Sequence, residues 1–95
     1  MKKYQSYINQ LETHLFKKDE SRFLAQQLLR LHKETELKPN PLIVELGVDR
    51  GQSTRVFLNA IDGKQNAKLI SIDIKDCSNA VIDENWDLYN KTLQI

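Results

Sequence analysis

The sequence predicts a small α/β fold in which a helical hairpin precedes an incomplete βαβ unit with parallel strands. Two short apolar runs, Leu42–Leu46 and Lys68–Asp73, have the length of buried strands. A glycine-bearing turn and a helical segment lie between them, an order that is typical of parallel βαβ units. Before the first run, Lys38-Pro39-Asn40-Pro41 interrupts any helix. We therefore divide the chain into a helical hairpin, residues 1–38, and a partial Rossmann-like unit, residues 39–95.

The first part of the chain has helical periodicity. An apolar stripe recurs at helical spacing near the start, formed by Tyr4, Tyr7, Ile8, Leu11 and Leu15. We predict that this helix ends near Lys17-Lys18, where cations suit the negative end of the helix dipole. A second helix is predicted over Arg22–Lys33, with Asp19 or Ser21 as its N-cap. The two helices form a hairpin that needs another surface to cover, either the second face of the sheet or its edge.

The chain after the proline break is predicted in less detail toward its end. A third helix is expected from Gln52 or Ser53 to Ile61, closed by Asp62-Gly63. After Asp73 the pattern indicates a loop at 76–79 and a helical turn at 80–85. The segment Trp86–Ile95 fits a strand or a short helix, and we favour a weak strand or a frayed end.

Composition excludes several classes of protein. The chain has 14 basic and 13 acidic residues, and the resulting net charge of +1 gives no reason to expect nucleic acid or an anionic membrane as a partner. No apolar run approaches the roughly 20 residues that span a bilayer. The single cysteine, Cys77, excludes an internal disulfide and a multi-cysteine zinc site, and it favours a reducing, cytoplasmic setting. We interpret His14 and His32 as solvated helix residues, and we expect no metal site.

The glycine turn carries the chemical signal. The first strand leads into Gly47 and Gly51, which let the backbone bend sharply and approach a ligand closely. Ser53 or Thr54 can satisfy the unpaired amides at the start of the following helix. Asp73 ends the next strand, where a carboxylate can accept hydrogen bonds from the two hydroxyls of a ribose. This order predicts a nucleoside site at the carboxyl edge of the sheet.

Glu45 is unusual because it interrupts an otherwise apolar strand. A buried carboxylate is costly unless it is hydrogen-bonded or paired. We favour an arrangement in which Glu45 accepts hydrogen bonds from loop amides and shapes the ligand turn. The alternative is that it points to solvent at a sheet edge.

Two segments resemble motif I and the second-strand acid of class I S-adenosylmethionine-dependent methyltransferases. They are Glu45-Leu46-Gly47-Val48-Asp49-Arg50-Gly51-Gln52-Ser53-Thr54 and, further along the chain, Ser71-Ile72-Asp73. They are most similar to the small-molecule O-methyltransferases related to cephalosporin hydroxylase and macrolide-sugar methyltransferases. In those proteins the segment tends to read Glu-Ile-Gly-Val-x-x-Gly-Gly-Ser-Thr. The resemblance covers about residues 40 to 75. Asp49 stands where many class I enzymes have a glycine.

The resemblance implies S-adenosylmethionine as cofactor, with Glu45 and Asp49 in its binding motif. Gly47 and Gly51 would line the methionine part, Ser53 or Thr54 would donate hydrogen bonds near the cofactor carboxylate, and Asp73 would bind the ribose. The family's catalytic residues lie on later strands, so no catalytic residue is assigned here. The implied reaction is O-methyl transfer to a small-molecule substrate in the intact fold, with this chain alone inactive.

Two other functions remain open. A dinucleotide-binding fragment of the NAD type is disfavoured, because Gly-x-x-x-Gly is not the Gly-x-Gly-x-x-Gly spacing that seats a pyrophosphate. A non-catalytic helical interaction or oligomerisation module, with the βαβ unit as scaffold, is compatible with the amphipathic hairpin. The open sheet edge also suggests that the chain forms a homo-oligomer.

Overall fold

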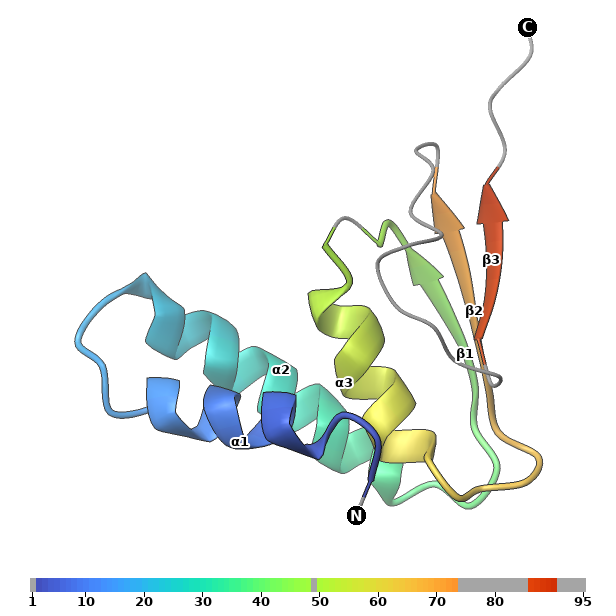
Figure 1. Cartoon of the computed structure of the whole chain (residues 1–95), viewed down its shortest axis with the longest axis horizontal. Coiled ribbons are helices and arrows are strands. Elements are labelled where there is room, and N and C mark those ends of the chain that lie inside the picture. The colour runs from blue at the N-terminus through green and yellow to red at the C-terminus, as the bar shows by residue number, and fades with distance from the viewer. Residues whose placement is uncertain (1, 49, 74–85, 91–95) are drawn as a thin grey trace, which may run out of the picture.

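The computed structural model of the chain describes residues 2–48, 50–73 and 86–90 (Figure 1). In these residues the elements run α1 (Gln5–His14), α2 (Glu20–Glu36), β1 (Leu42–Leu46), α3 (Gln52–Ile61), β2 (Lys68–Asp73) and β3 (Trp86–Asn90). The predicted α/β fold with a leading helical hairpin is confirmed. Asp49, the loop at 76–79 with Cys77, the helical turn at 80–85 and residues 91–95 lie outside the described part.

The three strands form one parallel sheet in the order β1-β2-β3. Leu42 pairs with Lys68 and Leu46 with Ile72, which fixes the register of the first two strands. On the other side of β2, Leu69 pairs with Trp86, so the strand that we favoured at Trp86 is confirmed. Because the strands are parallel, the end of β1 before Gly47 and the end of β2 at Asp73 lie at the same edge of the sheet.

The molecule has three layers, with α3 between the helical hairpin and the sheet (Figure 1). On one side of α3, Val56 packs in a cluster with four hairpin residues, Ile8, Leu11, Ala25 and Leu28. On the other side, Leu58 and Ile61 pack with Ala67 and Leu69. The expectation that the hairpin covers the second sheet face or a sheet edge is therefore wrong. α3 is apolar on two sides, and the hairpin buries the side that the sheet leaves open.

The ends of α2 have clear physical causes. It begins earlier than predicted, at Glu20, because the Asp19 carboxylate caps it by accepting a hydrogen bond from the Ser21 amide at 3.0 Å. It ends later, at Glu36, where the Lys64 ammonium donates to the Glu36 carbonyl at 2.6 Å and also contacts the Lys38 carbonyl. α1 ends at His14, before the predicted Lys17-Lys18.

One face of the sheet is apolar and exposed. Leu42, Val44 and Leu46 of β1 are 68%, 59% and 81% exposed, and Ile72 of β2 is 42% exposed. These four residues, which we call the outer sheet face, point away from α3, whereas Leu69 on the opposite face is fully buried. None of the helices in the described part of the chain is both long and apolar enough to cross a membrane.

Candidate functional site

The glycine turn has the backbone geometry that the sequence predicts. Gly47 adopts φ 86°, and its N–H donates to the Ile72 carbonyl on β2 at 2.8 Å. Gly51 adopts φ 78° at the N-cap of α3, and its N–H donates to the Val48 carbonyl at 2.8 Å. Both residues are in the left-handed region that a side chain makes costly. The turn is therefore tied to β2 at one end and closed on itself before α3 begins.

Asp73 lies directly beside this turn. Its Oδ2 accepts a hydrogen bond from the Val48 N–H at 2.6 Å. The two predicted halves of the site, the glycine turn and the second-strand acid, are thus in contact at one edge of the sheet. Its oxygens are acceptors of the kind that hydroxyl donors require.

Glu45 is buried beneath the turn, with 6% of its surface exposed. Its carboxylate accepts hydrogen bonds from three hydroxyls: Ser53 at 2.5 Å, Thr54 at 2.6 Å and Ser71 at 2.8 Å. The Trp86 indole N–H donates to the Ser71 hydroxyl at 2.7 Å, which extends the network to β3. The interpretation that Glu45 points to solvent is wrong. Among the described residues, its hydrogen-bond partners are these hydroxyls of α3 and β2, where we expected loop amides.

This network takes up the protons of the Ser53 and Thr54 hydroxyls. A hydroxyl has a single proton to donate, so a hydroxyl bound to Glu45 cannot at the same time donate to a ligand. In this arrangement the two side chains attach the first turn of α3 to β1. Polar contacts to a ligand would then come from the backbone amides at the start of α3.

A cavity of about 300 Å³ opens at the turn, and we call it the glycine-turn cavity. Gly47, Val48, Arg50 and Ser53 line it from the turn and the start of α3, and Leu24 and Leu28 line it from α2. A Cβ built on Gly47 would meet no heavy atom within 4 Å, so the space above this glycine is open. The cavity combines an apolar wall, backbone amides and one guanidinium, which suits a ligand with an apolar body and an anionic group.

The sequence did not identify Arg50, Leu24 or Leu28 as site residues. For Arg50 the sequence held a signal, because it is a basic residue between the two glycines. In the structure, the Arg55 guanidinium donates a hydrogen bond to the Arg50 carbonyl at 2.7 Å. Nothing in the sequence marked Leu24 and Leu28 of α2 as site residues. They approach the turn only because the hairpin packs on α3, and that packing is a tertiary event.

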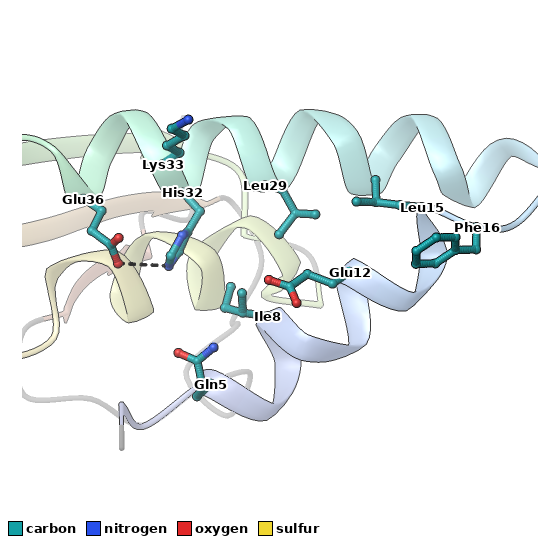
Figure 2. A pocket seen from close by; sticks show the side chains of 9 residues that line it. All are labelled: Gln5, Ile8, Glu12, Leu15, Phe16, Leu29, His32, Lys33 and Glu36. Carbon is teal, nitrogen blue, oxygen red and sulfur yellow. Dashed lines mark ion pairs between the residues drawn. The ribbon is translucent and has the colours of Figure 1, made fainter.

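A larger groove of about 790 Å³ lies along α1 and α2, away from the glycine turn (Figure 2). Four apolar side chains line it, Ile8, Leu15, Phe16 and Leu29, and Glu12 and Lys33 are among its polar residues. None of the described residues of the turn or of the sheet lines this groove. The residues that the sequence predicts for a nucleoside site therefore do not line the larger groove.

Two histidines have structural surroundings that differ from the expectation. The His32 side chain is only 14% exposed, its Nε2 lies 2.5 Å from Asn59 Oδ1, and Glu36 is 3.8 Å away. His14 is half-buried, and its Nδ1 is covered without a hydrogen-bond partner in the described part of the chain. The prediction that both are solvated is wrong. Within the described residues, no group of three His, Cys, Asp or Glu side chains could hold a metal ion.

Comparison with known proteins adds no relative: no protein-family model, curated protein or solved structure matches the chain.

Proposed function

We propose that the chain binds S-adenosylmethionine at the edge formed by the glycine turn and Asp73, as the cofactor-binding part of a methyltransferase-like protein. In an intact fold the reaction would be transfer of the sulfonium methyl group to an oxygen of a small molecule. The chain alone would bind the cofactor without completing the reaction. A reducing, cytoplasmic setting belongs to the same proposal and suits the single cysteine.

The observation that carries the proposal is the hydrogen bond of 2.6 Å between the Val48 amide and the Asp73 carboxylate. It brings an acid on β2 against a left-handed glycine turn on the neighbouring parallel strand. This is the arrangement in which a carboxylate accepts ribose hydroxyls while the turn faces the rest of a nucleoside.

The residues present fit the cofactor in chemical type. The methionine end of S-adenosylmethionine carries a carboxylate, and Arg50 and the first amides of α3 offer positive charge there. Leu24 and Leu28 offer apolar contact to the methylene groups of the methionine part. The cavity volume of about 300 Å³ lies at the lower end of the range for small-molecule sites, so part of the cofactor would remain at the surface.

Calorimetric titration of the full chain with S-adenosylhomocysteine, NAD and adenosine tests the proposal. We expect S-adenosylhomocysteine to bind more tightly than adenosine, because only the former reaches Arg50 with a carboxylate. We expect no measurable binding of NAD, because the turn lacks the spacing for a pyrophosphate. Preferred binding of NAD would favour the dinucleotide function. If none of the three compounds binds, the nucleoside proposal is wrong.

A second candidate is self-association, and the exposed outer sheet face favours it. Parallel sheets are normally covered on both faces. At the margin of this face, Lys68 Nζ and Asp87 Oδ2 form a salt bridge at 2.8 Å. Because these two charges cancel, two copies can meet here without repulsion. We propose a second copy of the chain as the occupant. Sedimentation equilibrium should show a dimer that Leu46→Lys dissociates and that Leu37→Lys, on an exposed leucine at the end of α2, preserves. A monomer at millimolar concentration would contradict this candidate.

A further inference from the structure

The groove of about 790 Å³ along α1 and α2, which we call the hairpin groove, has an apolar lining that the chain leaves partly uncovered (Figure 2). Leu15 and Leu29 are half-buried and pack against the buried cluster of the hairpin. Phe16, at one end of the groove, is 89% exposed. Apolar surface that borders a groove and is rimmed by polar residues is typical of a protein interaction site.

The shape of the hairpin groove suits an α-helix. It lies between the two helices of the hairpin, and a third helix packs into such a groove through side chains spaced i, i+4 and i+8. The 10 residues of α1 extend about 15 Å, a length that three turns of an added helix would cover. Neither wall is a strand, so an extended peptide would find no ladder of backbone partners.

The wall formed by α1 has a definite pattern. Ile8, Glu12 and Phe16 line the groove four residues apart, so an apolar, an acidic and an apolar side chain follow one another along the same side of the helix. A helix that lies along this wall would match it with an apolar, a basic and an apolar residue at the same spacing.

The charge of the groove favours a basic partner. The Glu12 carboxylate points into the space between α1 and α2, whereas the Lys33 ammonium points away from α1 (Figure 2). Among the described residues Glu12 has no ion-pair partner, in contrast to Glu36, which forms a salt bridge with Lys2 at 2.7 Å. A cation from a partner would therefore meet an unpaired carboxylate in the groove.

We propose that the hairpin groove binds an amphipathic helix of a partner protein, which presents a lysine or arginine between two apolar residues at positions i, i+4 and i+8. The cation pairs with Glu12, and the apolar residues cover Phe16 and Leu29. The groove lies away from the glycine turn, so this inference does not rest on cofactor binding.

Two synthetic peptides of about 16 residues, long enough to form a helix, are the probes. The basic peptide carries Leu-x-x-x-Lys-x-x-x-Leu, and the acidic peptide has glutamate in place of that lysine. Fluorescence anisotropy with the full chain measures their affinities. We expect the basic peptide to bind about fivefold more tightly than the acidic one, because one exposed ion pair contributes up to about 1 kcal/mol.

A charge reversal locates the contact. Glu12→Lys should reverse the preference, so that the acidic peptide binds more tightly than the basic one. The control Glu34→Lys makes the same change in net charge at an exposed residue of α2 outside the groove, and it should keep the preference of the wild-type chain. Equal binding of both peptides, or a preference that Glu12→Lys leaves unchanged or that Glu34→Lys also reverses, would overturn the proposal.

An apolar substitution tests the second half of the contact. Phe16→Ser should weaken both peptides roughly tenfold, because they no longer bury this side chain. Phe23→Ser, at a 67% exposed position outside the groove, should weaken neither. Both phenylalanines are exposed, so we expect both variants to fold, which circular dichroism checks. Equal effects of the two substitutions would contradict binding in the groove.

Sedimentation without peptide tests a second copy of the chain as the occupant. Phe16→Ser should leave the oligomeric state of the wild-type chain unchanged. If Phe16→Ser instead dissociates an oligomer, the groove holds another copy and the proposal of a basic partner helix is wrong.

Discussion

At the scale of single residues, Glu45 connects β1, β2 and α3. Its buried carboxylate accepts from Ser53, Thr54 and Ser71, so one side chain fixes the start of α3 over the sheet. Replacing it with glutamine leaves one acceptor oxygen and points an NH2 group at hydroxyl donors. We expect Glu45→Gln to lower the free energy of unfolding by about 2–4 kcal/mol, because hydrogen bonds to a buried charge are lost.

Urea denaturation followed by circular dichroism measures this change. The matched control is Glu34→Gln, an exposed residue of α2 whose partner is Arg30 at 3.1 Å. That surface pair should contribute less than about 1 kcal/mol. A Glu45→Gln variant as stable as the Glu34→Gln variant would contradict the role given to this network.

The sequence identified Glu45 as exceptional but could not identify its partners. Ser71 is its partner because the register pairs these two residues directly. Register depends on how the whole strands pack, and a pattern of apolar residues does not determine it to one residue. The glycines and Asp73 were predictable because their chemistry depends on position along the chain, at the ends of strands.

The pair formed by Glu36 and Lys2 gives a pH-dependent contribution to stability. The hydrogen bond from Lys2, at 2.7 Å, lowers the pKa of Glu36 below its ordinary value of 4.5, although burial opposes the shift. The stabilisation is therefore complete above pH 4.5 and is lost as the pH falls through the lowered pKa. In Lys2→Met we expect the NMR titration of Glu36 to move to higher pH. Because the pair is largely exposed, Lys2→Met should lower the free energy of unfolding at pH 7 by less than about 1 kcal/mol. An unchanged titration midpoint of Glu36 in this variant would show that Lys2 does not act on Glu36.

At the scale of elements, Lys64 attaches the end of α2 to the loop that follows α3. Its ammonium donates to the Glu36 carbonyl at 2.6 Å and lies 3.4 Å from the Thr35 carbonyl. A cation at these carbonyls also complements the helix dipole. We expect Lys64→Met to lower the free energy of unfolding by about 1–2 kcal/mol.

Hydrogen exchange localises that effect. The amides of Leu37 and Lys38, which bond to the last turn of α2, should exchange faster in Lys64→Met. Lys18→Met, on an exposed lysine between α1 and α2, should leave these two amides unchanged. Equal exchange in both variants would show that Lys64 does not stabilise the end of α2.

The existence of α1, α2 and α3 followed from apolar spacing, and the chain position of β1 and β2 followed from short apolar runs. The ends of α2 did not follow in full. Asp19 was a recognised capping residue, whereas Lys64 lies far along the chain and reaches α2 only in the folded molecule. Local signals therefore predicted the start of this helix better than its end.

At the scale of the whole molecule, α3 couples the hairpin to the sheet. The sequence suggested two units divided near residue 38. In the structure Val56 packs on the hairpin while Leu58 and Ile61 pack toward the sheet, so the two hydrophobic clusters share one helix. A helix with two apolar sides can pack in more than one way, and the sequence alone did not indicate which surface the hairpin would cover.

Leu28→Ala tests this coupling. Leu28 is 5% exposed in the hairpin cluster, and its truncation should lower the free energy of unfolding by about 2–5 kcal/mol. Helical circular dichroism and the fluorescence of Trp86, which packs on the sheet cluster, should still change together with urea. Separate transitions for the two signals would show that the hairpin and the sheet unfold independently. The control Leu31→Ala, at a 39% exposed position of α2, should have a smaller effect.

We propose that Asp73 and the glycine turn together bind the ribose of S-adenosylmethionine, and calorimetry on Asp73→Asn tests this most directly. The substitution keeps an oxygen that can accept from the Val48 amide and removes the charge that would hold the ribose hydroxyls. We expect S-adenosylhomocysteine to bind this variant about 10- to 100-fold more weakly, as for hydrogen bonds to a charged group, while Asp87→Asn on β3 binds it normally. Equal affinity of the wild-type chain and Asp73→Asn for S-adenosylhomocysteine would contradict the claim.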